Sequence, residues 1–335
     1  MAMRTATARA AWVAAVALLL PVTGLAQVTP QAVFVSAVTD GRPVLDLEAS
    51  EFRIREEGES REVLLVNRAE VPVQVAILVD DSYGVTSNLG HLRRGLVELV
   101  DALPDAQMST VIAFGDQLRT LVDFTQDKDE LRRVVGEFAQ FSETSWYLPN
   151  ALAETAIDMW DRGAVRPIIV LVTSEGAAAT TARVRRFRQG DAVVSPRGGQ
   201  GMAYDRVLEI LRDTKVAVHT LVVRGAGMAS LADGFGGDPG TRGLSQDTAG
   251  DRDRASLLEE LPRVTGGGRE ELGATSALAE MLNRIGDEIS NQYFVVYARP
   301  AVLVPPEEIE VSVTRRGVRV RSTPAHPILL QSPQQ

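Results

Sequence analysis

The feature that most constrains this chain is an apolar run that ends abruptly in a polar cluster. Residues 73–79 read Val-Gln-Val-Ala-Ile-Leu-Val, and Asp-Asp-Ser-Tyr-Gly follows directly at residues 80–84. A run this rich in valine and isoleucine is typical of a strand buried on both faces, as in the middle of a parallel sheet. Open α/β sheets place their ligand sites just past the carboxyl ends of such strands. The polar cluster is therefore the first candidate for a functional site.

Strands and helices alternate after this run, which predicts an α/β domain. Buried strands are expected at 73–80, 108–114, 118–124, 167–173 and 216–223, and helices at 91–103, 127–138, 148–160, 204–214, 255–261 and 276–290. A tight turn at Gly115-Asp116 joins two of the strands, so these two should be antiparallel neighbours. The segments 189–202 and 225–254 are rich in Gly, Asp, Ser and Arg, and we predict that they are mobile loops.

β-hairpin patterns lie on both sides of this domain. Strands are expected at 32–38, 51–56 and 61–66, and again at 293–297, 309–314 and 318–321. Each flank alone would leave an apolar face uncovered, whereas together they supply about six strands. We therefore predict an α/β domain inserted into a small all-β sandwich that both flanks build. The expected boundaries are 30–70 and 292–323 for the two β segments, 72–291 for the α/β domain and 324–335 for a tail.

The N-terminus has the pattern of a secretory signal peptide. Arg4 and Arg9 precede an apolar run at 10–21, and small residues follow where a signal peptidase would cut, near Ala26. The run is too short to span a bilayer comfortably, and no second such run follows. We expect residues 1–26 to be removed, leaving a mature protein without a membrane span in the periplasm or outside the cell. The chain has no cysteine, so disulfides cannot stabilise it.

Charge and motifs exclude several classes of function. The net charge is −9 and the chain has no dense stripe of lysine and arginine, which argues against a nucleic-acid partner. No Gly-x-Ser-x-Gly elbow, Walker loop or His-Glu-x-x-His motif occurs. The three histidines lie in different elements, and His219 is expected to be a hydrogen-bonded strand residue. The glycines at 266–268 follow a helix, so they are predicted to form a turn and not a phosphate site. We expect a protein that is not an enzyme.

Taken in order, these segments resemble a von Willebrand factor type A domain. The likeness rests on one strand that ends Asp80-Asp81-Ser82, a second that ends Val172-Thr173, and the strand–helix alternation. From about 31 to 322 the chain resembles, more specifically, the VWFA-related domain proteins described from Acidobacteria. The matching segments are Val-Leu-Asp-Leu at 44–47, Glu-Phe-Arg-Ile-Arg-Glu-Glu-Gly at 51–58, Val-Thr-Gly-Gly at 264–267 and Tyr-Phe-Val-Val-Tyr at 293–297. The resemblance implies a doubly wound, mostly parallel sheet with helices on both faces and one antiparallel edge strand.

The resemblance also implies where a metal ion would bind. Many type A domains have a metal-ion-dependent adhesion site, built from an Asp-x-Ser-x-Ser loop, a threonine of a second loop and an aspartate of a third. Oxygen atoms surround Mg²⁺ there in an octahedron, and the partner supplies a carboxylate. This chain has Asp80 and Ser82, but Gly84 replaces the second serine. Thr144 or Ser145 is available in the second loop.

The third loop departs from the family pattern as well. Ser174 takes the place of the aspartate, and Glu175 is displaced by one residue. We therefore predict a degenerate site and no required cofactor, with Asp80 and Ser82 forming local hydrogen bonds. If Mg²⁺ or Ca²⁺ does bind, Asp80, Ser82 and Thr144 are the expected ligands, and Glu175 or Asp81 would replace the missing acid.

The function that these features favour is an exported protein-binding module for adhesion or complex assembly. It would bind an unidentified protein partner through the loops at the top of the sheet without requiring a metal. The expected contact residues are Asp81, Tyr83, Trp146, Tyr147 and Glu175. Two alternatives stay open. One is a cation-dependent adhesion module with a working Mg²⁺ or Ca²⁺ site, and the other is a hydrolase that pairs Asp80 or Asp81 with Glu175.

Overall fold

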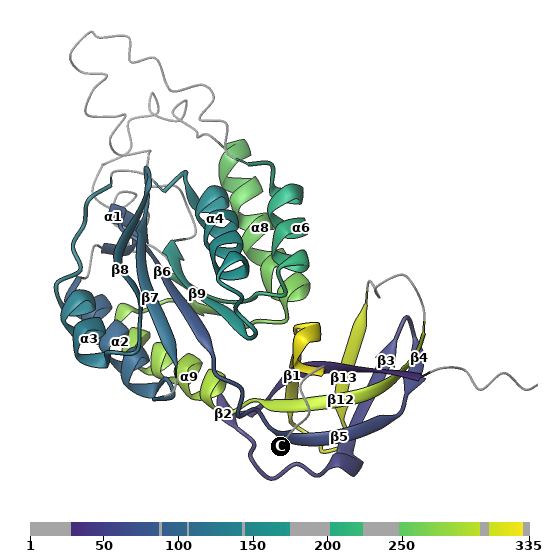
Figure 1. Ribbon diagram of the computed structural model, residues 1–335. Helices are drawn as coiled ribbons and strands as arrows, with labels where there is room; N and C mark the ends of the chain where they lie inside the picture. The colour runs from purple at the N-terminus through teal and green to yellow at the C-terminus, as the bar shows by residue number, and fades with distance from the viewer. Residues whose placement is uncertain are drawn as a thin grey trace, which may run out of the picture.

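The computed structural model describes residues 28–86, 89–105, 107–142, 145–174, 202–223, 248–301 and 308–330. They form an α/β part and a β part (Figure 1). Several expectations from the sequence lie outside the described residues: the signal peptide, Thr144, Glu175, and most of the two predicted loops. The side chain of Tyr83 is also outside what the structure describes.

The α/β part is organised around one six-stranded sheet. Its strands are β6 (Gln74–Asp80), β7 (Met108–Phe114), β8 (Leu118–Thr125), β9 (Pro167–Ser174), β10 (Ala217–Val223) and β11 (Arg269–Leu272). Their order is β11-β10-β9-β6-β7-β8, and all neighbours are parallel except β7 and β8. The central position of β6 and the antiparallel edge strand agree with the predicted fold. Two details were wrong: β8 is only half-buried, because it lies at the edge, and the short polar strand β11 was not predicted.

Helices cover both faces of this sheet. One face carries α2 (Leu89–Ala102), α3 (Lys128–Gly136) and α9 (Leu278–Ser290), and the other carries α4 (Leu148–Asp161), α6 (Tyr204–Asp213) and α8 (Thr248–Thr265) (Figure 1). Successive side chains of β6 enter the two layers in turn, as strand geometry requires. Val75, Ile77 and Val79 pack in the first layer, whereas Ala76 and Leu78 pack in the second. The short α1 (Tyr83–Thr86) follows β6, and a 3-10 turn (Thr275–Ala277) precedes α9.

The helix α8 is longer than the sequence suggested. We expected a helix only at 255–261, with a loop up to 254 and a stop before Pro262, but α8 extends from Thr248 to Thr265. Its buried leucines, Leu257, Leu258 and Leu261, begin only after the polar run Asp-Arg-Asp-Arg at 251–254. The composition of that run is typical of a loop, but the run is helical. The prediction of a loop up to residue 254 was therefore wrong from Thr248 onward. Arg254 consequently belongs to a helix.

The β part is built from both ends of the described chain. Its strands are β1 (Val28–Thr39), β2 (Arg42–Pro43), β3 (Phe52–Glu56), β4 (Glu59–Arg61), β5 (Val63–Arg68), β12 (Tyr293–Pro300), β13 (Ile309–Val313) and β14 (Arg319–Pro324), with 3-10 turns at Ala49–Glu51 and Pro327–Leu330. One sheet has the order β14-β1-β12-β5 with β2 beside β1, and a second has the order β13-β3-β4. Strands from the two flanks therefore pair with each other in both sheets.

Apolar side chains of both sheets meet in one cluster, which includes Val33, Phe52, Ile54 and Val295. The strand connections differ in two places from the expected hairpins. Only β4 returns along β3, whereas β5 pairs with β12 in the other sheet. Likewise, β13 and β14 belong to different sheets. In each case the chain crosses between sheets so that both strands can add apolar side chains to the shared cluster.

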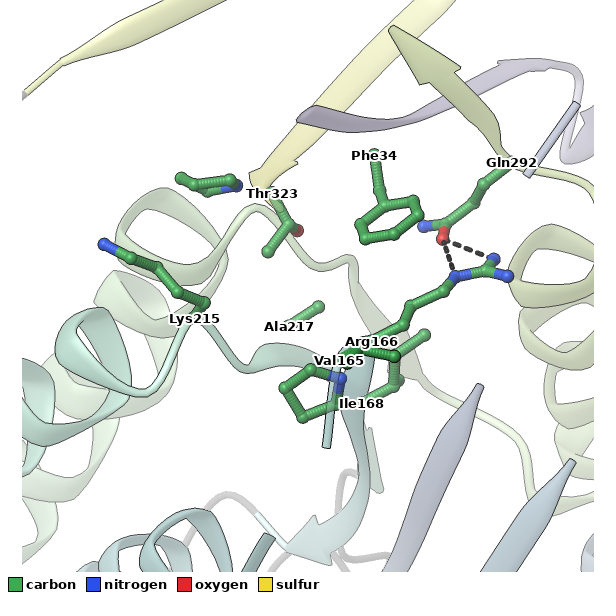
Figure 2. Close-up of a pocket in the computed structure, with 10 residues that line it drawn as sticks. Phe34, Val165, Arg166, Ile168, Lys215, Ala217, Gln292 and Thr323 are labelled. Carbon is green, nitrogen blue, oxygen red and sulfur yellow. Dashed lines mark hydrogen bonds between the residues drawn. The ribbon is translucent and has the colours of Figure 1, made fainter. Parts of the chain in front are cut away.

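One buried arginine links the two parts. Arg166 precedes β9, and its guanidinium donates to Gln292 Oε1 at 2.7 Å (Figure 2). It also donates to the Ile289 carbonyl at 2.6 Å. It also lies over the ring of Phe34 on β1, at 5.1 Å from the centroid. Burial lowers the pKa of Arg166 to about 10. The cavity beside these residues measures only about 10 Å³, which is room for one water at most.

Candidate functional site

The candidate site lies where the chain direction across the sheet reverses. After β6 the chain continues to β7 on one side, and after β9 it continues to β10 on the other. Doubly wound sheets form a crevice outside the carboxyl ends of the two strands at this point. Asp80 ends β6, Thr173 lies near the end of β9, and the Thr173 hydroxyl donates to Asp80 Oδ2 at 2.9 Å. The polar cluster singled out in the sequence therefore stands at this reversal of chain direction.

Asp80 and Ser82 shape the turn that leaves β6. Both residues are fully buried, and the Ser82 amide donates to Asp80 Oδ1 at 3.0 Å. The Ser82 carbonyl accepts hydrogen bonds from the amides of Val85 and Thr86, which begin the next helical turn. Ser82 Oγ has no hydrogen-bond partner within the part of the chain that the structure describes. The turn thus fixes the Asp80 carboxylate with its Oδ2 facing β9.

The cation beside Asp80 is an arginine that sequence reasoning missed. Arg254 of α8 is only 4% exposed, and its Nη2 lies 3.3 Å from Asp80 Oδ2 and 2.5 Å from Thr173 Oγ1. Its Nη1 donates to the Ser145 carbonyl at 2.8 Å, and its Nε donates to the Ser174 carbonyl at 3.3 Å. The guanidinium is thus held by oxygen atoms from three places: the end of β6, the end of β9 and Ser145. No motif distinguishes Arg254 from its neighbours in the sequence, because only the packing of α8 brings it to the strand ends.

Asp81 is paired with a second arginine. It is fully buried, and its Oδ2 accepts a hydrogen bond from Arg119 Nη2 at 2.5 Å. The Arg119 guanidinium in turn lies under the ring of Phe141, at 4.0 Å from the centroid. Gly115 makes this close packing possible, since a Cβ atom there would lie 2.5 Å from Asp81 Oδ1 and 2.3 Å from Ser142 Cβ. Asp81 therefore holds Arg119 inside the protein. The sequence analysis expected Asp81 to contact a partner, and this is corrected because its side chain is fully buried.

Residues 139–142 and 145–147 are held against the residues that follow β6 and β7. Their backbone is held at two points, where the Phe141 amide donates to the Asp81 carbonyl and the Tyr147 amide donates to the Gly115 carbonyl. Phe141 is 64% exposed and Trp146 is 43% exposed, and we call these two side chains the aromatic rim. The Tyr147 hydroxyl donates to Glu154 at 2.7 Å, a bond that raises the pKa of Tyr147.

The described residues do not fit a divalent ion at this position. Of the expected ligand oxygens, Asp80 Oδ2 already faces the Arg254 guanidinium, which also contacts the Ser145 and Ser174 carbonyls. Within the described ranges, no group of three or more histidine, cysteine, aspartate or glutamate side chains is close enough to hold a metal ion. Ser174 stands where the family has an aspartate and supplies no carboxylate. Among the described residues, Asp80 supplies the carboxylate that contacts the guanidinium.

A second polar cluster lies at the junction between the two parts. A cavity of about 160 Å³ is lined there by His219 of β10, Glu288 of α9 and Arg321 of β14, among others. His219 is a buried strand residue, as expected, and its Nδ1 accepts a hydrogen bond from the Gly268 amide at 3.4 Å. Burial lowers the pKa of His219 to about 4, although the charge on Glu288 opposes this shift. The imidazole is therefore neutral at neutral pH.

Comparisons with known proteins show similarity at the level of solved structures. No protein-family model and no curated protein matches the chain. Conserved hypothetical protein BatB from Bacteroides thetaiotaomicron is 16% identical over 64% of this chain and 98% of its own, with a TM-score of 0.40. The vWF domain of the type V pili tip protein Mfa5 from Porphyromonas gingivalis is 12% identical over 65% of this chain and 95% of its own, with a TM-score of 0.42.

A von Willebrand factor type A structure from Catenulispora acidiphila is 11% identical over 91% of this chain and 67% of its own, also with a TM-score of 0.42. Values this low carry no argument about function, and the assignment of the fold rests on the sheet itself. Its mostly parallel strands and its antiparallel edge strand are those that the sequence resemblance implied. The α/β part therefore has the doubly wound, mostly parallel fold that the resemblance to von Willebrand factor type A domains implied. No helix among the described residues combines the length and the apolar character needed to cross a membrane.

Proposed function

We propose that this protein is an exported binding module that contacts a protein partner through the loops at the carboxyl end of its α/β sheet. The contact would serve adhesion or complex assembly and would require no metal ion. The aromatic rim is the observation that carries this proposal. Two large aromatic side chains are exposed on a segment whose backbone is fixed to Asp81 and Gly115. Partially buried aromatics on a rigid base are the side chains that dominate binding energy at protein interfaces.

The buried layer beneath the rim supports the same proposal. Asp80, Asp81, Arg119 and Arg254 form ion pairs that hold the described residues at the strand ends in place before a partner arrives. A preordered surface loses less conformational entropy on binding than a flexible one. The rim would supply the apolar contact, and the exposed part of Tyr147 would extend it. Tyr83 and Glu175 remain proposed contact residues from the sequence alone.

Export and the organisation of the flanks complete the proposal. The sequence pattern at residues 1–26 supports a cleaved signal peptide and a periplasmic or extracellular mature protein. We also propose that the two sheets of the β part are one sandwich, with the α/β domain of 72–291 inserted between its halves. Their shared apolar cluster supports this arrangement. Membership of the VWFA-related proteins described from Acidobacteria stays a proposal drawn from the sequence motifs.

The two alternatives have less support. A cation-dependent adhesion site would need the position that Arg254 fills. A hydrolase that uses Asp80 or Asp81 would need a carboxylate accessible to substrate, whereas both are fully buried and each is paired with an arginine.

A capture experiment with a matched control tests the proposal. The mature wild-type protein and a Phe141→Ala, Trp146→Ala variant would be immobilised and exposed to extract of the exported proteins of the source cells. The control is Trp160→Ala, because Trp160 is 44% exposed but lies at the other end of α4, roughly 20 Å from Trp146. We expect specific proteins to be captured by the wild type and the control, with EDTA present or absent, and to be lost from the rim variant. Equal capture by all three proteins would refute the proposed face.

A further inference from the structure

The Arg254 guanidinium lies where three separate places of the chain meet. In the family that this sequence resembles, three loops supply the oxygen ligands of one divalent ion. Here the same three places meet at one guanidinium: the loop after β6 through Asp80, the segment at 139–147 through Ser145, and the end of β9 through Thr173 and Ser174. The side chain of Arg254 is 5% exposed, so the guanidinium lies inside the protein. Its planar fork of donors can serve several oxygen atoms at once, which a lysine ammonium cannot do in the same geometry.

Among the described residues, the charges at this place balance without a metal. Asp80 is fully buried and carries one negative charge, which the single positive charge of Arg254 offsets. Asp81 is neutralised separately by Arg119. With Ser174 in place of an aspartate and Gly84 in place of a serine, these two positions have one carboxylate fewer than the family pattern. A buried charge without a partner is strongly unfavourable. A site with one carboxylate fewer therefore needs one positive charge fewer, which fits a singly charged guanidinium in place of a doubly charged ion.

We propose that Arg254 is the resident cation of this site and takes the place of the divalent ion. The guanidinium ties the three loops together permanently, so their arrangement does not depend on the supply or removal of metal. The described N–H contacts of this cation are directed to oxygen atoms of the same chain, so its coordination does not depend on a partner carboxylate. This inference concerns the chemistry of the strand ends and holds whether or not the aromatic rim binds a protein.

The test compares cation binding by four proteins. Wild type, Arg254→Ala, Asp80→Asn and the double variant Arg254→Ala, Asp80→Asn would be freed of metal and titrated with Mn²⁺ and Mg²⁺. Thermal unfolding and the electron paramagnetic resonance signal of free Mn²⁺ are the readouts. We expect no stoichiometric binding and no thermal shift in wild type. Arg254→Ala should gain a shift of several degrees in millimolar Mn²⁺, because the ion can then neutralise Asp80, and the double variant should lose that gain.

Two results would overturn the inference. One is a single Mn²⁺ bound by wild type and lost in Asp80→Asn, which would mean that Arg254 leaves room for the metal. The other is a folded Arg254→Ala variant that gains no cation-dependent stabilisation, which would mean that the oxygen atoms around Arg254 are not a cation site. If Arg254→Ala does not fold in the absence of metal, refolding in the presence and absence of Mn²⁺ replaces the thermal measurement. Recovery of folded protein only with Mn²⁺ supports the inference, and no recovery in either condition counts against it.

Discussion

Replacing Arg254 with methionine should strongly destabilise the protein, and the cost should depend on Asp80. Methionine keeps much of the side-chain length but provides no donor for Asp80, Thr173, Ser145 or Ser174. The Asp80 carboxylate would be left fully buried without its cation. Removing one partner of a buried, hydrogen-bonded ion pair costs about 3–5 kcal/mol. We expect a loss of this size in the free energy of unfolding at pH 7.

A double-mutant cycle separates the ion pair from simple loss of packing. In the Asp80→Asn background the carboxylate charge is already absent, so Arg254→Met should cost about 2 kcal/mol less than it does in wild type. Urea unfolding followed by tryptophan fluorescence is suitable, because Trp146 and Trp160 both lie in the α/β part. The control is Arg206→Met, since Arg206 pairs with Glu209 on the exposed surface of α6. That substitution should change stability by less than about 0.5 kcal/mol.

Two outcomes would contradict this reasoning. If Arg254→Met were no more destabilising than the Arg206→Met control, the guanidinium would contribute nothing to the folded state. If the costs of Arg254→Met and Asp80→Asn were additive, the two residues would not interact across the distance of 3.3 Å that separates them. The urea dependence of the free energy must be the same in all variants for the comparison to hold.

Three further predictions concern the junction of the two parts. Arg166→Met should cost about 3–5 kcal/mol, because it leaves Gln292 and the Ile289 carbonyl without their buried cationic donor. Gly267→Ala should cost about 1–3 kcal/mol or more, since its Cβ would lie 2.0 Å from the Val218 carbonyl, whereas Gly273→Ala meets no atom within 4 Å and should be neutral. Below pH 6.5 the protein should lose stability, by about 3 kcal/mol on reaching pH 4, because unfolded chains protonate His219 near pH 6.5 and the native state does so only near pH 4. Urea or thermal unfolding of each variant, and a pH series for wild type and His219→Gln, are the measurements.

Each of these predictions has a clear contrary result. Arg166→Met with wild-type stability would mean that the junction does not depend on that guanidinium. Equal effects of Gly267→Ala and Gly273→Ala would mean that the close backbone approach at Gly267 is not required. The charges that face His219 come from Glu288, Arg321 and Arg166, and they are retained in His219→Gln. An unchanged pH dependence in that variant would therefore exclude His219 as the cause.

Much of the fold was predictable from local patterns. The strands at 73–80 and 167–173 are long, continuous apolar runs, and both occupy the middle of the sheet as expected. Asp40-Gly41 is a dipeptide typical of turns, and both residues have positive φ angles between β1 and β2. The pairing of β5 with β12 could not be predicted from alternation, because a strand with one apolar face fits either sheet of the β part.

The candidate site was predictable only in part. Asp80 and Ser82 could be placed at a strand end because the hydrophobic run stops at Asp80. Arg254 could not be placed, because it lies 174 positions from Asp80 in the chain and in a polar run that resembles a loop. Its role depends on the packing of Leu257, Leu258 and Leu261, which fixes α8 against the sheet. A substitution of the metal by a side chain from a distant helix leaves no local signal in the sequence.

The most direct test of the central claim is a crystal structure of the mature protein grown and soaked in millimolar Mn²⁺, with anomalous diffraction recorded. We predict a guanidinium between Asp80 and Thr173 and no anomalous peak beside Asp80. An anomalous peak at about 2.1 Å from an Asp80 oxygen, with Arg254 turned away, would contradict the claim that the arginine replaces the metal.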